Sequence, residues 1–305
     1  MAYEAKIILD SIGPSGARLT TFELTYPRFV HAELMTHRVF SRNSASSRAI
    51  PTEKLLERIK GDPVLPVWWG RNQPGMQARE EIAPVDRIAA EGLWIAARNE
   101  SVAYALALGR MGLHKQIANR VMEPWMFITV VVTATEWDNF WALRDHPDAQ
   151  PELAEVAAKA HKVYAENTPV HVDAGDWHLP YVTGFDMHEI GPVFLDDRDL
   201  RLISVGRCAA VSYLHQDKRD PEADIARAKK ILAAGHMSPF EHVAQAMTRN
   251  EWGQSAMAAS ILWAFDRIPP GNLWGWRQYR KMLKSEHDFS QIEKLEKIEK
   301  KTETP

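Results

Sequence analysis

The spacing of hydrophobic and polar positions predicts a chain that mixes strands and helices. Near its start, residues 6–10 and 18–25 are expected to form two strands, separated by a Gly-Pro-Ser-Gly turn at residues 13–16. Farther along, the β-branched run at residues 127–132 predicts a buried strand. Residues 200–213 are expected to form a strand followed by a helix. These stretches supply the predicted strands.

Apolar residues at helical spacing predict the remaining elements. The predicted helices are residues 27–38, 51–59, 84–111, 113–122, 138–143, 151–164, 221–234 and 255–265. In the helix at 84–111, the residues expected to face the interior are Ile88, Leu93, Ile95, Ala96, Val102 and Leu106. Asp220 is expected to cap the helix at 221–234, and Gly235 to end it.

These elements group into two parts. Residues 1–170 form the predicted N-terminal part and residues 200–283 the C-terminal part. Residues 171–199 contain Pro, Gly, His, Asp and Trp without periodicity, so we expect an irregular linker there. Residues 284–305 form a charged tail.

Composition narrows the class of protein. The 305 residues are 45% hydrophobic and 25% charged, which is ordinary for a globular chain, and the formal net charge of −3 disfavours binding to a nucleic-acid polymer. The chain starts without a signal-peptide pattern, and its apolar runs at 125–134 and 256–265 are too short for a membrane helix. Cys208 is the only cysteine, which excludes an intramolecular disulfide. We therefore expect a cytoplasmic protein that does not associate with a membrane.

The stretch from Pro27 to Arg48 carries the first candidate chemistry. Glu33 and His37 are four residues apart, which places both on one helix stripe, and Arg38 follows. The Ser- and Asn-rich stretch after them favours a loop that, with its arginines, is suited to holding a phosphate. The spacing of His31, Glu33 and His37 does not match a zinc protease motif, and we expect no metal site.

Two further constellations stand out. Arg120 precedes Pro124 by four residues, and Asn139 precedes Arg144 by five; alone, all could be solvent-facing helix residues. The octet GHMSPFEH at residues 235–242 reads as a helix start capped by Ser238, but that interpretation leaves His236 unexplained. Cys208, in a run of small residues, is expected to be buried rather than nucleophilic.

Together these motifs resemble those of the flavin-dependent thymidylate synthases. That family carries an Arg-His-Arg followed seven residues later by Ser-x-Arg, which His37, Arg38, Ser46 and Arg48 match, with Thr36 in place of the first arginine. The family's Arg-x-x-x-Pro, Asn-x-x-x-Leu-Arg and Gly-His-x-Ser/Thr-Pro-Phe-Glu-His are similar to segments here, with Glu33, Asp148 and Pro151 at positions where other residues are usual. The octet follows the signature here instead of preceding it, so the motif order looks permuted or half-duplicated. The duplication is suggested by Asn272, Gly275 and Arg277, spaced like Asn43, Ser46 and Arg48.

The resemblance implies an α/β (α+β) subunit with a mostly antiparallel central sheet and long helices, assembled as a homotetramer. It implies FAD as cofactor and reductive methylation of dUMP to dTMP, with methylenetetrahydrofolate and NADPH as co-substrates. The residues implied for dUMP are Glu33, Ser46, Ser47, Arg48, Arg120 and Arg144, of which Arg144 and Ser46 are the catalytic candidates. Those implied for FAD are His37, Arg38, Asn43, Asn139, His236 and Ser238.

Two other functions remain open at this stage. The same pocket could hydroxymethylate a pyrimidine deoxynucleotide, because Thr36, Glu33 and Asp148 change polar groups near flavin or substrate. Alternatively, the chain is a nucleotide- or flavin-binding paralogue without turnover. The sequence also leaves open which pyrimidine is used, and whether the octet completes a site in its own subunit.

Overall fold

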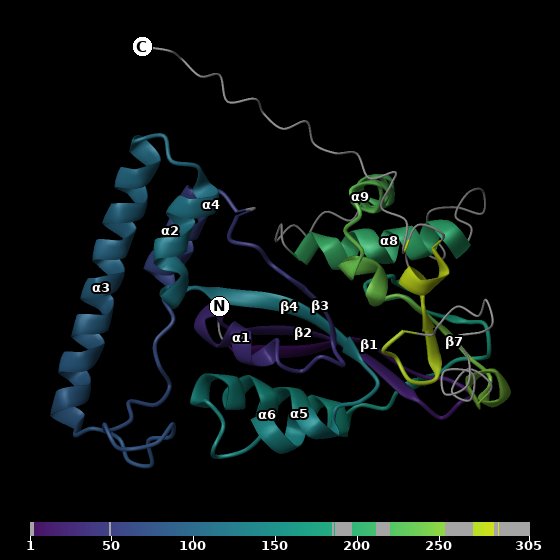
Figure 1. The fold of residues 1–305 in the computed structure, drawn as a ribbon, viewed down its shortest axis with the longest axis horizontal. Coiled ribbons are helices and arrows are strands. Elements are labelled where there is room, and N and C mark those ends of the chain that lie inside the picture. Colours follow the sequence, from purple (N-terminus) through teal and green to yellow (C-terminus); the bar gives the residue numbers. More distant parts are fainter. Residues whose placement is uncertain are drawn as a thin grey trace, which may run out of the picture.

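A five-stranded sheet forms the centre of the molecule (Figure 1). The computed structural model describes residues 3–48, 50–184, 186, 197–211, 220–253, 271–283 and 286. The strand order is β3-β4-β2-β1-β5, and every pairing is antiparallel except that of β5 with β1. The expected mixed α/β class with a mostly antiparallel sheet is therefore confirmed.

The sheet contains three of the predicted strands and two that were not predicted. β1 (Glu4–Ile12) and β2 (Arg18–Pro27) form the expected hairpin, and β4 (Phe127–Ala134) pairs along its whole length with β2. β3 (Ser41–Ser44) lies where a loop was expected, because the exposed edge of β4 pairs with its backbone. β5 (Val170–His171) completes the other edge.

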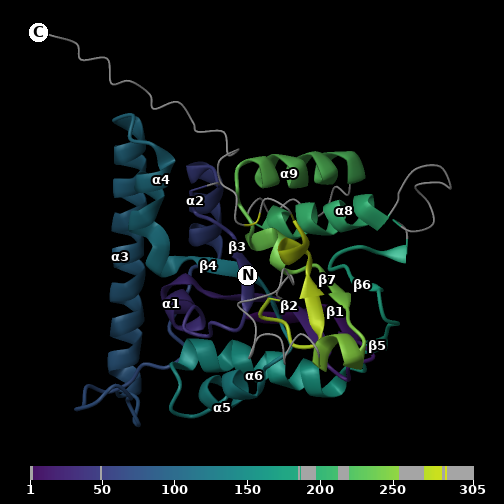
Figure 2. The same ribbon diagram turned by 45° about the vertical axis from the view of Figure 1, so that its right-hand side comes forward.

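Residues of β4 alternate between two different environments. Ile128, Val130 and Val132 pack with β2 against α5 (Asp138–Arg144) and α6 (Pro151–Glu166), which cover one face. Val131 and Thr133 point to the other face. There, α8 (Asp197–Ala210) and α9 (Pro221–Ala233) lie on the opposite side of the sheet from α5 and α6 (Figure 2).

The helices α8 and α9 approach each other closely. A Cβ atom on Gly206 of α8 would lie 2.2 Å from the backbone oxygen of Asp224 in α9, so glycine permits this contact. Arg207 donates to both Asp186 and Asp224 in the same region. The strand predicted at the start of 200–213 is wrong, because α8 covers that stretch and is buried from Leu202 to Ala210. A fully buried apolar run has no period that separates a strand from a helix.

Other helical predictions are confirmed, shortened or undescribed. Asp220 accepts from the backbone N–H groups of Glu222 and Ala223, as a cap should, and Gly235 adopts φ 72°. The helix expected at 27–38 is reduced to η1 (Arg28–Val30) and α1 (His31–Leu34). The one at 113–122 becomes α4 (Lys115–Ala118) and η2 (Asn119–Trp125). The predicted helix at 255–265, and the tail except Glu286, lie outside the described residues.

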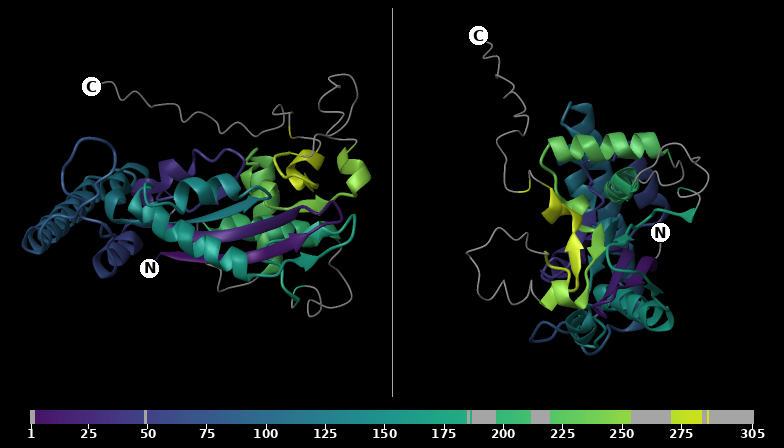
Figure 3. Two further views of the ribbon diagram at one scale, coloured as in Figure 1. Left: turned by 90° about the horizontal axis from the view of Figure 1, so that it is seen from below. Right: turned by 90° about the vertical axis from the view of Figure 1, so that its right-hand side faces the viewer.

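The long helix α3 (Pro84–Arg110) stands at one end of the molecule, with α2 (Thr52–Gly61) between it and the sheet (Figures 1 and 3). Its predicted inward face is only partly correct. Val102 is buried, whereas Ile88 is 74% and Leu93 is 72% exposed, because the described chain covers α3 only towards its C-terminal end. Among the described helices, none combines the length and apolar character needed to cross a membrane.

A smaller sheet of β6 (Trp177–His178), β7 (Ala244–Ala246) and β8 (Trp276–Gln278) packs beside the first. The stretch at 171–199, expected to be irregular, thus contributes β6 and the start of α8. The two-part division of the chain remains a prediction.

A chain of buried polar groups joins the two sheets. His178 bonds Ser11 through Nδ1 (2.9 Å) and Thr21 through Nε2 (2.8 Å). Thr21 bonds Thr133, which bonds Nδ1 of His242 at 2.8 Å. Burial lowers the pKa of both histidines to about 3, so both rings are neutral at pH 7.

Candidate functional site

The turn after α1 is organised by its own backbone. The amide of His37 donates to the carbonyl of Leu34, and Thr36 donates to Glu33 through both its amide and its hydroxyl. These tight bonds end the helix at Leu34. Arg38 consequently lies on an exposed turn, and no polar partner is observed for its side chain within the described chain.

The guanidinium of Arg144 reaches this turn from the end of α5. Its Nε donates to Nε2 of His37 at 3.0 Å and its Nη1 to Oε2 of Glu33 at 3.0 Å. Its Nη2 donates to the hydroxyl of Thr36 at 3.2 Å and to the carbonyl of Glu33 at 3.3 Å. The side chain of Arg144 is 17% exposed, so this cluster is fixed in position while one edge stays open.

His37 is a neutral acceptor in this cluster. Burial is the main cause that lowers its pKa to about 4, and the charges of Arg144 and Arg42 lower it further. The ring stacks on Phe40 and meets Phe140 edge-on. His37 is therefore placed to orient Arg144 rather than to act as an acid at neutral pH.

Glu123 in η2 is the shared partner of a second set of side chains, which includes predicted site residues. Its Oε1 accepts from the hydroxyl of Ser47 (2.8 Å) and from Nη1 of Arg120 (2.8 Å), and it forms an ion pair with Nε of Arg28 (2.9 Å). Beside Ser47, the hydroxyl of Ser46 accepts from the backbone N–H of Arg48. Two of the implied dUMP ligands, Ser47 and Arg120, thus meet at one carboxylate, and Arg120 is still 46% exposed.

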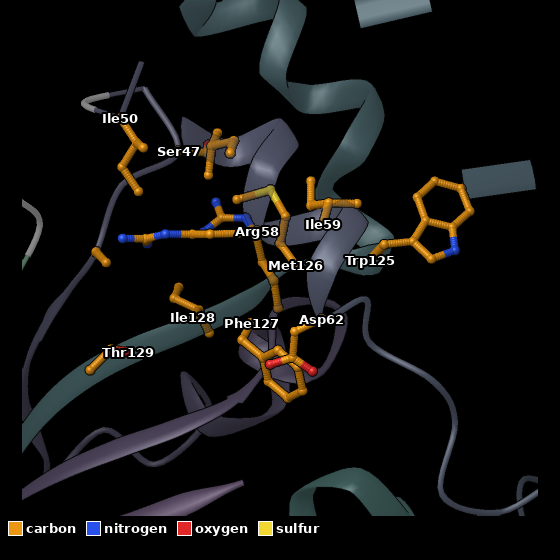
Figure 4. Close-up of a pocket in the computed structure, with 13 residues that line it drawn as sticks. Ser47, Ile50, Arg58, Ile59, Asp62, Trp125, Met126, Phe127, Ile128 and Thr129 are labelled. Atoms are coloured by element: carbon orange, nitrogen blue, oxygen red, sulfur yellow. The ribbon is translucent and has the colours of Figure 1, made fainter. Parts of the chain in front are cut away.

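A small, mostly apolar cavity of about 80 Å³ lies next to Ser47 (Figure 4). It is enclosed by α2, the end of η2 and β4, with Ile59, Trp125 and Met126 among its walls. Arg58 also lines it, and burial lowers the pKa of that guanidinium. The cavity is smaller than the 300–1,000 Å³ typical of sites for drug-sized ligands, so it does not by itself define a ligand site.

The octet packs against β3 within the same chain. Its η4 (Ser238–Glu241) places the hydroxyl of Ser238 3.5 Å from Oδ1 of Asn43, and Asn43 donates to the carbonyl of Cys208. Ser238 makes no capping bond, so its prediction as a helix cap is wrong; Pro239 occupies the first turn as expected. His242, the last residue of the octet, is a buried structural residue.

The structure brings together some predicted residues and not others. Arg144 meets Glu33 and His37, Arg120 and Ser47 both bond Glu123, and Ser238 meets Asn43. The side chains of Asn139 and His236 are exposed, and no polar contact is observed for either of them within the described ranges. Sequence reasoning missed Glu123, although its position three residues after Arg120 predicts an ion pair on a helical turn.

Two alternative chemistries find no support in the site. Cys208 is fully buried, and burial raises its thiol pKa, which makes it unreactive as expected. His31 bonds the hydroxyl of Tyr26 instead of joining Glu33 and His37, and no three potential ligands converge as a metal site in the part of the chain that the structure describes.

A mostly antiparallel sheet covered by helices defines an α/β protein, in which arginines gather around Glu33 and Glu123. The Thy1 family model, described as thymidylate synthase complementing protein, matches residues 18–170, and the chain belongs to this family. It is thus a thymidylate synthase-like enzyme of the transferase class.

Two solved structures of a UMP/dUMP methylase, PolB from Streptomyces cacaoi, are also similar. The one bound with 5-Br UMP has 15% sequence identity and a TM-score of 0.44, covering 54% of this chain and 89% of that one. The one bound with 5-Br dUMP has 20% identity and a TM-score of 0.40, covering 49% and 66%. No curated protein matches the sequence.

Proposed function

We propose that the protein catalyses the reductive methylation of dUMP to dTMP, with FAD as cofactor and methylenetetrahydrofolate and NADPH as co-substrates. The observation that carries the proposal is the meeting of Ser238 with Asn43, 195 residues apart in sequence. It brings the octet to the signature strand of a Thy1 chain, although the two motifs are in the reverse order along it. The proposal therefore places both in one subunit's site.

The dUMP phosphate is assigned to the Glu123 cluster. Guanidinium groups match phosphate oxygens in pairs, and Arg120 and Arg48 are both exposed enough to receive them. The hydroxyls of Ser46 and Ser47 supply further donors. Glu123 holds Arg120 in place before the nucleotide arrives and competes with its phosphate.

Arg144 is assigned to the pyrimidine ring. A cation fixed at the ring's edge stabilises the negative charge that develops on the base when carbon 5 becomes nucleophilic. Glu33 and His37 orient that guanidinium, and the proposal gives Glu33 an additional contact with the base. No side-chain nucleophile is required.

The residues present fit the flavin in part. Arg38 and His236 are exposed, and the amide and hydroxyl of Asn43 and Ser238 are half-buried, which suits them to the polar atoms of a dinucleotide. Asn139 is exposed on α5 and belongs to the same proposed set. His37 differs, because Arg144 already occupies its Nε2, and its proposed role is to position that arginine. When bound, flavin supplies the hydride equivalents that reduce the transferred one-carbon unit to a methyl group.

Assembly with further copies of the chain, as a homotetramer, is part of the proposal. The apolar side chains of Val85, Ile88 and Leu93 on α3 are each more than 70% exposed, a face that a second copy would cover. Light scattering of the purified protein tests this assembly, and a monomer at micromolar concentration would overturn it.

The decisive experiment follows flavin colour and product mass together. The purified protein is reconstituted with FAD, reduced without oxygen, and mixed with dUMP and methylenetetrahydrofolate. We expect reoxidation of the flavin only with both substrates, and a product with the mass of dTMP. A product heavier by one oxygen would establish the hydroxymethylating alternative, which the polar changes at Thr36 and Glu33 favour; flavin binding without turnover would establish a silent paralogue.

A further inference from the structure

A second cationic site lies between the signature turn and the segment at 271–283. A pocket of about 540 Å³ opens there, and its lining includes Arg38, Arg42, Asn272, Gln278, Arg280 and Lys281. The last four lie outside the part of the chain that matches the family. None of the lining residues belongs to the Glu123 cluster. We infer that this pocket binds a phosphate or pyrophosphate group of a ligand other than the substrate nucleotide.

The charges of the pocket are only partly balanced. Arg280 pairs with Glu241 and Glu286, and Lys281 also pairs with Glu286. Arg42 is held by backbone carbonyls, since its Nη1 donates to those of Met35 and His37. Arg38 has no observed polar partner within the described residues. Four cations thus face two carboxylates in the described chain, which leaves an excess of positive charge for an anion.

Hydrogen bonds hold the backbone segments around these cations in place. Nε2 of Gln278 donates to the hydroxyl of Ser41 and to the carbonyl of Glu241, and Asn272 donates to the carbonyl of Val39. Gly271 has φ 97°, and a Cβ atom there would lie 2.0 Å from Oε1 of Gln278. The turn, β8 and the octet are therefore tied together before any ligand binds, which reduces the cost of ordering the site.

The chemistry of the lining favours a phosphate group. Three of the four cations are arginines, whose planar forks match phosphate oxygens, and the volume lies within the range of ligand sites. The inference rests on the proposed function only for the source of the group, which a phosphorylated cofactor would supply. The anion site itself requires neither flavin nor methyl transfer.

The test measures calorimetric binding of inorganic pyrophosphate to the full-length protein. Arg38→Gln and Lys281→Gln are each expected to raise its Kd at least about tenfold, since each removes one charge-assisted contact. Lys229→Gln is the control, because Lys229 is an exposed cation on α9 outside the pocket lining. Circular dichroism verifies that each variant is folded.

Competition identifies the source of the group. Displacement of pyrophosphate by FAD or NADPH assigns the pocket to a dinucleotide, and retention in their presence assigns it to a smaller phosphorylated ligand. Equal affinity for pyrophosphate in all three variants would overturn the inference, as would displacement of pyrophosphate by dUMP. Tighter binding of triglutamate, a ligand with carboxylates but no phosphate, than of pyrophosphate would overturn it too. Because no step depends on turnover, a failure of the proposed reaction leaves this result interpretable.

Discussion

Arg144 and His37, 107 residues apart, are joined by a hydrogen bond of 3.0 Å between Nε of the guanidinium and Nε2 of the imidazole. A protonated imidazole could not accept this bond, so the contact and the lowered pKa of His37 require the same neutral ring. The hydroxyl of Thr36 receives another donor of Arg144. The threonine at the position of the signature's first arginine thus accepts a hydrogen bond from Arg144, which a second guanidinium there would repel.

Replacing this arginine tests the coupling directly. In Arg144→Gln the pKa of His37 should rise from about 4 but stay below 6.5, because burial, the larger cause of the shift, remains. Titration of the His37 ring by NMR measures it. If the proposed function holds, the variant also lowers kcat by about 10²–10³, the usual effect of removing one donor to developing charge.

Arg110→Gln, an exposed change at the end of α3, is the matched control and should leave the His37 titration unaltered. An unchanged His37 pKa in Arg144→Gln would contradict the arrangement described.

Neutralising Glu123 should tighten nucleotide binding. Glu123→Gln keeps a hydrogen-bond acceptor for Ser47 but removes a negative charge. That charge repels the phosphate and competes with it for Arg120. We expect the Kd for dUMP to fall about three- to tenfold, equivalent to roughly 1 kcal/mol. Equilibrium dialysis with dUMP measures it, and Arg120→Gln should shift the Kd in the opposite direction. Weaker binding in Glu123→Gln would place the phosphate elsewhere.

The two buried histidines should make the protein acid-sensitive. His178 and His242 have a folded-state pKa of about 3 against an ordinary value of 6.5, so below pH 6.5 the unfolded chain takes up protons that the folded chain does not. Stability should therefore be constant above about pH 7 and fall as pH drops from 6.5 towards 3. Each histidine contributes a slope approaching about 1.4 kcal/mol per pH unit.

Urea unfolding between pH 7.5 and 4.5 measures this slope, and His178→Gln should reduce it. His161→Gln is the control, since that ring is exposed and bonds Asp145 on the surface. A slope that His178→Gln leaves unchanged would assign the acid sensitivity to other groups.

Adding a methyl group at the contact between α8 and α9 should push the two helices apart and destabilise the protein. Gly206→Ala puts a Cβ atom 2.2 Å from the backbone oxygen of Asp224, which cannot rotate away, and should cost about 1–3 kcal/mol. Gly92→Ala has no neighbour within 4 Å and lies inside α3, where alanine is favoured by about 0.5–1 kcal/mol. Thermal or chemical unfolding should therefore move in opposite directions for the two variants.

Much of the secondary structure could be predicted because its signals are local. The β-branched run of β4, the long apolar pattern of α3 and the cap at Asp220 all act within a few residues. β3 could not be predicted, since Ser-Arg-Asn-Ser has no strand pattern and becomes a strand only because β4 offers its edge. The outward face of Ile88 and Leu93 was likewise unpredictable, as periodicity shows that a helix has an apolar side but not what covers it.

The candidate site divides in the same way. Resemblance to a family selected Arg144 and Glu33 for dUMP and His37 for FAD, and the structure joins all three through the guanidinium of Arg144. Glu123 was missed because its importance arises from Arg28 and Ser47, which reach it from distant parts of the chain. The pocket beside Arg38 depends on residues after 270, a juxtaposition that no spacing along the sequence encodes.

The pairing of β3 with β4 makes strand register a determinant of chemistry. Ser41 lies opposite Thr133 and Asn43 opposite Val131, so Asn43 faces Ser238 while Arg42 turns back to the preceding loop. Because side chains alternate with every residue, a slip of one position would exchange the surroundings of these two side chains. A single insertion or deletion between Thr36 and Ser41 would thus be equivalent to replacing several residues of the site at once.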